Sequence, residues 1–369
     1  MVATAQRFGE MRPDVEITWG KRSLQDFADS PIPRLAQQYD LLVIDHPFVG
    51  YAARHQVFLP LDDHLSPDFL KEQEENSVGL SFQSYAYEGH QWALAIDAAA
   101  PVSSWRPDLL DRAKASVPAS WDELLDLARF GLVSFPAIPI DALMHFYMLC
   151  CALNCEPFSR DGFVIGIDAG AQALSMLRDL VRRCSPDILN RDPIATYEAL
   201  TSGDTFAYCP FAFGYSNYSR RSYARNALRF GDLCQFGQFT KGRSTLGGAG
   251  LAISSACQNR HVALEYLRYV ASAECQQGMY VQSGGQPGHR SAWKDPEANC
   301  ATQNYFRDTL PTLDRAYLRP RYEGYVSFQE EAALLVHSFI REGGDAKATT
   351  RNLQGLYKRS GAHFTGIQS

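Results

Sequence analysis

The chain has 369 residues, of which 46% are hydrophobic and 21% are charged, and its formal net charge is −6. This length is enough for two domains, and the composition is that of an ordinary globular protein. The lack of a basic excess argues against a nucleic-acid surface. No apolar run approaches the roughly 18 residues that a membrane-spanning helix needs.

The amino-terminal part of the chain alternates helical and extended patterns. Residues 1–12 favour a helix, and the alternation over 15–19 is typical of a strand. A second helix is predicted over 22–38, followed by a short apolar strand over 41–44. This order indicates a parallel sheet covered on both faces. Because such a domain normally begins with a strand, we expect that an opening strand is missing from this sequence.

The end of the strand at 41–44 is the first candidate for a binding site. The strand stops at Asp45-His46-Pro47, because proline cannot donate to a sheet ladder. In open α/β sheets the carboxyl ends of strands face the ligand crevice. Two interpretations of Asp45 remain open. It caps the helix that starts near Phe48, or it meets a polar ligand together with His46.

The rest of the chain continues the α/β pattern. Ser120 and Glu123 form a capping box, with Trp121 as a packing anchor beside it. Phe211 and Tyr215 belong to an aromatic cluster that we place on a loop. Strands are predicted at 91–96, 102–105, 206–210 and 251–253, and helices at 118–128, 141–155 with Asp141 as its cap, 170–184, 197–202, 261–271 and 328–340, with a last helix ending near Tyr357.

The cysteines and histidines do not form a recognisable metal or redox motif. The nine cysteines are odd in number and scattered, with no CxxC pair, which fits a reducing compartment. The histidines lack the spacing of metal ligands. His145 lies on an apolar helix and is either a core residue or a ligand contact. The chain opens without a visible basic-then-apolar leader.

Motifs of the common enzyme classes are missing as well. The sequence contains no GxSxG elbow, P-loop, HExxH or GxGxxG. No pair of carboxylates can be assigned as a glycosidase acid and base. We therefore predict no catalytic residue, no metal and no cofactor.

Five segments in chain order resemble family 1 extracellular solute-binding proteins of ABC importers, the group that includes maltodextrin-binding proteins. They are YDLLVID with FLPLDDHL, YEGHQWALAIDAAAPVSSWRPDLL, PASWDELLDLA, SGDTFAYCPFAFGYSN and STLGGAGLAISSACQNRHVALEYLRYVASAECQ. The resemblance covers nearly the whole chain. It implies a type II-like, two-lobed α/β periplasmic-binding-protein fold, with the first strand of the N-terminal lobe missing. One lobe would take residues 1–103 and 253–316, and the other 104–252 and 317–369.

The resemblance also implies a set of ligand-binding positions. Apolar sugar faces would stack on aromatic rings, while carboxylates accept hydroxyl protons. The sites carried over are Asp45, His46, Asp97, Tyr147, Phe211, Tyr215, Gly247, Gly248, Gln286 and Arg290. Other interpretations stay open: core packing for Phe211, a solvated aromatic for Tyr215, turn geometry for the two glycines, and a surface ion pair for Arg290.

The function that the resemblance implies is ligand binding without catalysis. The chain would be the substrate-binding component of an ABC importer, would bind a small carbohydrate or polyol-like ligand, and would be a monomer with a membrane permease as its partner. The implied location is the periplasm, whereas the cysteine usage also fits the cytoplasm. The alternative is an intracellular enzyme or ligand sensor on the same two-lobed scaffold.

Overall fold

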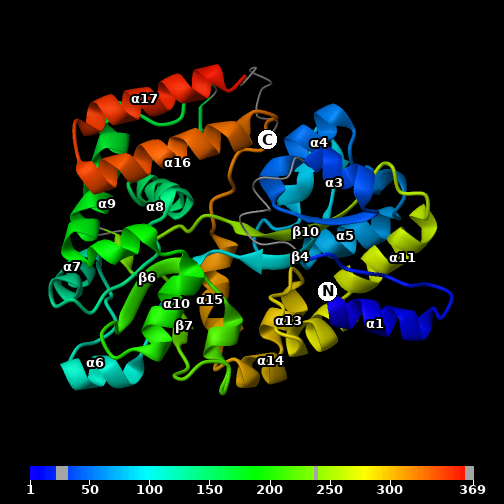
Figure 1. Ribbon diagram of the computed structural model, residues 1–369, viewed down its shortest axis with the longest axis horizontal. Coiled ribbons are helices and arrows are strands. Elements are labelled where there is room, and N and C mark those ends of the chain that lie inside the picture. The colour runs from blue at the N-terminus through cyan, green and yellow to red at the C-terminus, as the bar shows by residue number, and fades with distance from the viewer. Residues whose placement is uncertain (22–31, 161, 237–239, 362–369) are drawn as a thin grey trace. The chain divides into compact units, whose positions relative to one another are not determined.

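The computed structural model describes all of the chain except residues 22–31, 161, 237–239 and 362–369 (Figure 1). The chain divides into two compact units. Unit 1 contains Met1–Ala99 and Gly247–Cys300, and unit 2 contains Ala100–Leu246 and Ala301–Ser369. The predicted lobes assign residues 301–316 to the first lobe, whereas the contacts group them with unit 2. Within the described residues, no helix is long and apolar enough to cross a membrane.

Unit 1 is built on a three-stranded sheet in the order β1 (Leu41–Ile44), β10 (Gly247–Ile253) and β4 (Leu94–Ala99). Both pairings are antiparallel. The predicted parallel pairing is therefore wrong, although β1 and β4 do run in the same direction. The reason is that β10, which comes some two hundred residues after β1, lies between them and runs the opposite way.

Side chains from the two faces of this sheet enter two hydrophobic cores. Leu42 and Ile44 of β1 belong to the core that α3 (Ile32–Gln38) and α4 (Val49–His55) cover. Leu41 and Val43 point to the opposite face and pack against the core beneath α1 (Val2–Met11) and α11 (Arg260–Ala271). The strict alternation follows from the two-residue period of a strand. It explains why this segment is apolar throughout.

The predicted strand at 15–19 is extended but is not part of a sheet. Its side chains alternate, with Val15, Ile17 and Trp19 partly buried and Glu16 and Thr18 exposed. Among the described residues no strand pairs with it, so the prediction of a sheet strand is wrong here. The predicted helix at 22–38 is present from Ile32 onward, and its first ten positions lie outside the described residues.

The other elements of unit 1 are short and connect the sheet to its covering helices. Ser66 caps α5 through a hydrogen bond from the Phe69 N–H. The short connecting elements of unit 1 are η1 (His46–Phe48), η2 (Leu61–Asp63), α5 (Pro67–Glu75), η3 (Gln83–Tyr85), β2 (Ala86–Tyr87), β3 (His90–Gln91), α12 (Ala273–Cys275), the π-helical turn η6 (Gln276–Tyr280), α13 (Arg290–Lys294) and α14 (Pro296–Ala301). The last residue of α14 belongs to unit 2.

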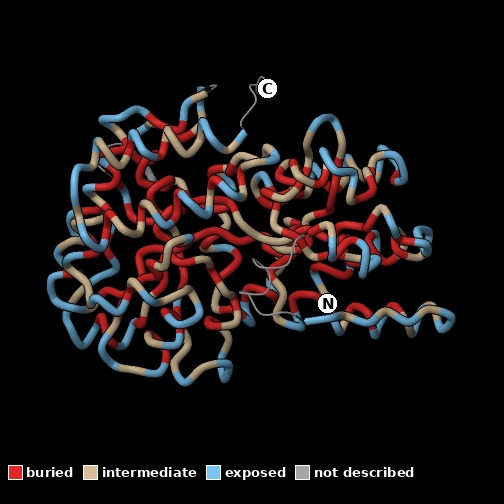
Figure 2. The backbone as a smooth tube through the Cα atoms, turned by 45° about the horizontal axis from the view of Figure 1, so that its top comes forward, coloured by how far each residue is buried: buried red, intermediate tan, exposed pale blue. Residues whose placement is uncertain are grey.

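Unit 2 is organised around the helix α8 (Pro139–Ala152). Every residue of α8 from Asp141 to Ala152 is buried, which Figure 2 shows as a continuous buried stretch. α8 packs against α9 (Ile167–Arg183) and α16 (Tyr325–Glu342), as Figure 1 shows. A helix that is apolar on all sides needs neighbours on all sides. The sequence places the start of this helix at Asp141, but it begins at Pro139, whose fixed φ suits a first turn.

A second antiparallel sheet lies in unit 2, in the order β6 (Tyr208–Phe213), β5 (Pro101–Trp105) and β7 (Arg229–Gly231). The sequence places Phe211 on a loop. That placement is wrong, because β6 continues to Phe213, which lies opposite Pro101 of β5.

The capping box at Ser120 is confirmed. The Ser120 hydroxyl accepts a hydrogen bond from the Glu123 N–H at 3.3 Å, and the Glu123 carboxylate accepts one from the Ala119 N–H at 2.8 Å. Trp121 is buried against Phe236, with ring centroids 5.2 Å apart, which confirms its packing role.

The other elements of unit 2 are α6 (Pro107–Ala113), α7 (Trp121–Arg129), η4 (Pro186–Asn190), α10 (Pro193–Ser202), η5 (Ser216–Ser219), β8 (Gln235–Phe236), β9 (Thr240–Lys241), α15 (Tyr305–Asp314) and α17 (Ala346–Arg359).

Candidate functional site

The candidate residues of unit 1 converge at one edge of its sheet. β1 ends at Ile44, which lies opposite Gly250, and Asp97 near the end of β4 lies opposite Ala249. Because β10 runs antiparallel to both neighbours, its first residues meet the carboxyl ends of β1 and β4. The topology therefore brings Asp45, Asp97 and Gly248 to the same sheet edge, from three distant parts of the sequence.

Asp45 both caps a turn and contacts His46. Its carboxylate accepts a hydrogen bond from the His46 backbone N–H at 2.8 Å and so caps the short helix η1, whereas the predicted cap of the helix that starts near Phe48 is wrong, because α4 has no side-chain cap. The same carboxylate oxygen lies 3.1 Å from Nδ1 of the His46 ring, which is fully buried. About a third of the Asp45 side chain stays exposed.

Tyr85 packs against the end of β1 and holds it through contacts with Ile44 and His46. Its hydroxyl donates to the carbonyl oxygen of Ile44 at 3.3 Å, and its ring meets the His46 ring edge-on at 6.3 Å. A Cβ on Gly250 would lie 2.6 Å from the Tyr85 ring, so only glycine allows the ring to pack there. The register of β10 also shifts between Ala249 and Gly250. This bulge redirects the strand at the point where the candidate residues meet.

Asp97 has the most strongly altered acidity at this edge. Burial raises the pKa of its carboxyl to about 7, against the opposing effect of a hydrogen bond from the Gln286 backbone N–H. The residue as a whole is intermediate in exposure, while its carboxyl group is the part that burial affects most. A carboxyl with this pKa changes charge close to neutral pH, so it can accept or donate a hydrogen bond under ordinary conditions.

Gly247 and Gly248 bring the β10 backbone close to β4. Gly247 lies opposite Ala99, and Gly248 lies opposite Ala98. Gly248 has φ +111°, and a Cβ there would lie 2.3 Å from the carbonyl oxygen of Asp97. The conformation and the close approach therefore both require glycine. Backbone geometry thus explains Gly248 without a ligand, whereas the role of Gly247 stays a prediction.

The loop after η6 covers the free side of β4. Gln286 is buried, its carbonyl accepts from the Ala98 N–H at 3.1 Å, and its amide lies 3.5 Å from the Ala98 carbonyl. Arg290, in contrast, donates through Nε to the carbonyl of Ser77 at 3.0 Å. Gln286 thus belongs to the edge that holds Asp97, whereas Arg290 anchors α13 to the turn after α5.

The candidate residues of unit 2 differ strongly in exposure. Tyr147 is fully buried among aromatic rings, with Phe158 at 6.0 Å and Tyr317 at 5.9 Å. Phe211 is also buried, with its ring 4.4 Å from that of His145. Tyr215 keeps part of its surface exposed and packs edge-on against Tyr197 at 6.1 Å. Core packing therefore accounts for Tyr147 and Phe211, while Tyr215 stays accessible.

Two buried polar residues lie on α8: His145, for which the core interpretation is confirmed, and Asp141, which was predicted to cap the helix but lies inside its first turn without a capping hydrogen bond. Burial raises the pKa of Asp141 to about 8 and lowers the pKa of His145 to about 3. Within the part of the chain described, Oδ2 of Asp141 and both ring nitrogens of His145 have no hydrogen-bond partner. The two residues are four positions apart, so they lie on one face of the helix. The apolar sequence around them was the only signal that they are buried.

One group outside this edge has the composition of a cation site. Ligand atoms of Asp62, Asp63 and His90 lie within 4.8 Å of one another. Asp62 already accepts hydrogen bonds from the Gln91 N–H at 2.8 Å and shares one with His90 Nδ1 at 2.8 Å. These bonds account for the cluster as a turn that joins η2 to β3. Sequence spacing could not reveal it, because the histidine lies 28 residues from Asp62.

All nine cysteines are free thiols, and most of them are buried. Burial raises the pKa of Cys151 and of Cys184 to about 12, so these thiols stay protonated at neutral pH. Thiols of this kind pack as small apolar groups and are poor nucleophiles.

Comparison with known proteins gives one family and many similar folds. The profile of a family described as bacterial extracellular solute-binding protein matches residues 3–303. The maltose-bound MalE3 of T. maritima is 16% identical, with a TM-score of 0.83 over 96% of this chain and 94% of that one. A solute-binding protein of an ABC transporter from Agrobacterium radiobacter, in complex with ribitol, is 16% identical, with a TM-score of 0.80 and coverage of 97% and 96%.

A third similar structure carries a different kind of ligand. It is UgpB of Mycobacterium tuberculosis in complex with glycerophosphocholine, which is 17% identical with a TM-score of 0.79. The alignment covers 97% of this chain and 93% of that one. At these identities the three structures share a fold with this chain.

Proposed function

Because the chain belongs to the family of bacterial extracellular solute-binding proteins, we propose that it is the substrate-binding component of an ABC importer and binds a small carbohydrate or polyol. The observation that carries the ligand class is the sheet edge of unit 1, where partly exposed carboxylates meet backbone groups held by glycine. Hydroxyl groups of a sugar or polyol are good donors to such carboxylates.

The structural relatives support this class of ligand. Their complexes contain maltose, ribitol and, in one case, glycerophosphocholine. All three are small, polar and rich in oxygen atoms. All three carry hydroxyl groups, so a shared chemistry of hydroxyl recognition supports the proposed ligand class.

In the proposed complex, Asp97 accepts a hydroxyl proton from the ligand in its ionised form. Asp45 supplies a second acceptor at the same edge, with the remaining surface of its capped carboxylate. Gln286 holds Asp97 in place through its backbone, and Gly248 lets the β10 backbone approach the ligand.

The remaining parts of the proposal follow from the family. The permease of an ABC importer is the expected membrane partner, and the protein acts outside the cytoplasmic membrane as a monomer. We assign it no cofactor and no catalytic residue. One observation favours an enzyme as the second candidate: a carboxyl with a pKa of about 7 suits general acid–base chemistry at neutral pH.

A ligand panel separates these two candidates. The purified chain is heated with maltose, ribitol, mannitol, tagatose or glycerophosphocholine, and positive results are followed by titration calorimetry. A binding protein gives a saturable rise in unfolding temperature and returns the ligand unchanged. Asp97→Asn should lose the response, while Asp141→Asn, which alters a buried carboxyl in unit 2, should keep it. Product formation, or no response to any compound, would overturn the proposal.

A further inference from the structure

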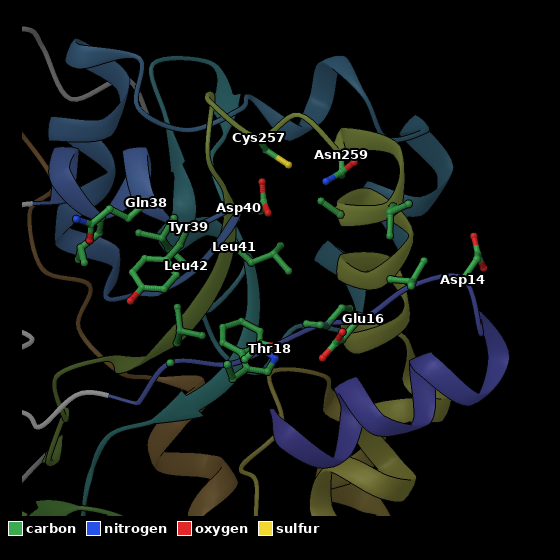
Figure 3. Close-up of a pocket in the computed structure, with 18 residues that line it drawn as sticks. Asp14, Glu16, Thr18, Gln38, Tyr39, Asp40, Leu41, Leu42, Cys257 and Asn259 are labelled. Atoms are coloured by element: carbon green, nitrogen blue, oxygen red, sulfur yellow. The ribbon is translucent and has the colours of Figure 1, made fainter.

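The two outer strands of the sheet in unit 1 have different surroundings. Beside β1 lies a cavity of about 570 Å³, and Figure 3 shows Leu42 and Thr18 among the residues that line it. Beside β4, residues 284–290 lie directly against the strand, because the Ala98 N–H donates to the Gln286 carbonyl at 3.1 Å. We call residues 284–290 the support loop. It forms the immediate neighbourhood of the candidate residues at the end of β4.

The support loop contacts Asp97 through one backbone group. The Gln286 N–H donates to the Asp97 carboxyl and opposes the rise in pKa that burial causes. Tyr280, just ahead of the loop, also lies near this carboxyl, because burial and then the charge of Asp97 raise the pKa of the Tyr280 hydroxyl. A donor favours the charged carboxylate only while its distance and direction are kept. Whatever fixes the Gln286 backbone therefore also sets the acidity of Asp97.

Gln276 joins the support loop to β4. Its side chain is fully buried, and it begins the π-helical turn η6, a kind of turn that often lies at functional sites. Its Oε1 accepts from the His289 N–H at 2.9 Å, and its Nε2 donates to the carbonyls of Val270 at 3.2 Å and Ile96 at 3.5 Å. Ile96 directly precedes Asp97 in β4. One buried amide thus connects the end of the support loop to the residue before Asp97.

The His289 ring connects the same end of the loop to α5. Its Nδ1 accepts from the Ser291 N–H at 3.3 Å and lies 2.8 Å from the Ser291 hydroxyl, so the proton of the neutral ring is on Nε2. Nε2 then donates to the Glu72 carboxylate at 2.9 Å. The His289 side chain is almost fully buried, whereas that of Glu72 is partly exposed. Because hydrogen bonds to an ionised acceptor are the stronger kind, Glu72 anchors the ring.

Backbone hydrogen bonds complete the attachment of the loop. The Val78 N–H donates to the Gly288 carbonyl at 3.1 Å, and the Arg290 N–H donates to the Asn76 carbonyl at 2.7 Å. A Cβ on Gly288 would lie 2.3 Å from the carbonyl oxygen of Ala95, so the loop and β4 are in direct contact. The support loop is therefore held by β4, by η6 and by the turn after α5, all within unit 1.

We propose that Gln276 and His289 are positioning residues of the candidate binding site, which hold the support loop so that the Gln286 N–H stays on the Asp97 carboxylate. Both act through the loop and not through contact with a ligand. The part that concerns ligand affinity rests on the proposed function, whereas the hold on Asp97 is a property of the free chain. A merely structural role would change stability alone, while a positioning role also changes the acidity of Asp97.

The test measures the pKa of Asp97 in the intact chain without ligand. Aspartate that is isotope-labelled at the carboxyl carbon is titrated by NMR, and Asp97→Asn identifies the signal. Gln276→Met nearly keeps the side-chain volume and removes the acceptor of the His289 N–H. The pKa of Asp97 should rise by about one pH unit, because a backbone donor to a carboxylate lowers its pKa by roughly that amount. An unchanged pKa would overturn the proposal.

Gln91→Met is the matched control. Gln91 is also a buried glutamine of unit 1, and its Nε2 donates to the carbonyls of Phe82 at 3.0 Å and Ala93 at 2.8 Å. Within the described chain, no hydrogen bond joins it to the support loop. Both variants should unfold at a lower temperature, but only Gln276→Met should move the pKa of Asp97. An equal rise in both would mean that general loosening of unit 1 sets this pKa, which would overturn the positioning role.

Variants at the second anchor cover the case in which Gln276→Met does not fold. His289→Asn keeps an acceptor for the Ser291 N–H, but its shorter side chain does not reach Glu72, so the pKa of Asp97 should rise. Glu72→Gln keeps an oxygen acceptor for the ring Nε2–H and should leave that pKa nearly unchanged, whereas Glu72→Ala should raise it. Equal pKa values in the two Glu72 variants would overturn the role of His289.

Ligand titration separates a failure of this inference from a failure of the proposed function. With a ligand from the panel, Gln276→Met should weaken binding about fivefold at pH 7 and hardly at all at pH 9, where Asp97 is ionised in both chains. A pKa that rises without this loss of affinity would confirm the positioning role and overturn Asp97 as the ligand acceptor. If no compound binds, the proposed function fails, and the NMR titration still decides whether Gln276 and His289 hold Asp97.

Discussion

Asp97 and Asp141 are two carboxyls whose pKa burial raises far above the ordinary value, to about 7 and about 8. Asp97 lies at a sheet edge in unit 1, keeps part of its surface exposed, and receives a hydrogen bond from the Gln286 backbone. Asp141 lies in the first turn of α8 in unit 2 and is almost fully buried.

The comparison shows that a raised pKa alone does not identify a binding site. Burial raises the pKa of both groups, yet only Asp97 combines that effect with access for a ligand and with other polar groups at the same edge. Asp141 shares α8 with His145, whose pKa is lowered to about 3. Both are polar groups buried in the core of unit 2, and the cost of burying each appears as a dependence of stability on pH.

The largest expected effect is on this dependence. The folded pKa of Asp141 lies about four units above the value in the unfolded chain, so its contribution to stability is complete below pH ~4 and is lost as the pH rises through about 8. Asp141→Asn should therefore be more stable than the natural chain at pH 9, by on the order of 3 kcal/mol, with a smaller difference at pH 5 that vanishes only near pH 4.

Urea unfolding at pH 5, 7 and 9 measures this difference. Asp97→Asn serves as the matched variant, and its smaller gain should accumulate from about pH 4 and be complete above about pH 7. His145 acts in the opposite direction, because its folded pKa is depressed and its contribution is lost as the pH falls from about 6.5 toward 3. An identical pH profile for the natural chain and Asp141→Asn would show that folding does not raise the pKa of Asp141.

The second effect concerns the backbone that presents Asp97. Gly248→Ala forces a side chain into φ +111° and against the Asp97 carbonyl oxygen, so it should cost roughly 3 kcal/mol of stability and remove ligand binding. Gly89→Ala is the control, because Gly89 also has positive φ but no heavy atom lies within 4 Å of its Cβ position. That variant should cost only about 1 kcal/mol. Equal losses in thermal unfolding would mean that conformation, rather than close approach, requires Gly248.

Sequence patterns predicted the local features of unit 1 well and its pairing badly. The strand at 41–44 and the end of that strand at Pro47 follow from apolar content and from proline chemistry, both of which are local. The position of β10 between β1 and β4 is a contact between segments some two hundred residues apart. No local pattern encodes it, so the alternation of helix and strand suggested a parallel sheet.

The candidate site shows the same contrast between residues that local sequence identifies and residues whose role depends on distant contacts. Asp45 and Asp97 were found because they follow or end apolar strands, and the resemblance to a family supplied their role. Burial of Tyr147 and Phe211 was not predictable in the same way, because an aromatic residue looks alike on a core face and on a binding face. Only packing against Phe158 or His145 separates these cases.

The third effect is the loss of ligand affinity in Asp97→Asn. An ionised carboxylate that accepts a hydroxyl proton contributes more than an amide, typically 1.5–3 kcal/mol for a hydrogen bond to a charged group, so affinity at pH 8 should fall about 10- to 100-fold. Asp141→Asn should bind as the natural chain does. Calorimetry with the best ligand of the panel measures both, and an equal loss in the two variants would indicate a general effect on folding.

The smallest effect is the dependence of affinity on pH, and it distinguishes the two carboxyls without changing the ligand. If ionised Asp97 is the acceptor, binding below pH 7 must first remove its proton, so the dissociation constant should rise about tenfold from pH 8 to pH 6. Asp97→Asn should show no such slope, and Asp141→Asn should retain it. A slope in the opposite direction would mean that protonated Asp97 donates to the ligand, which would change the preferred ligand from a hydroxyl donor to an anionic or carbonyl acceptor.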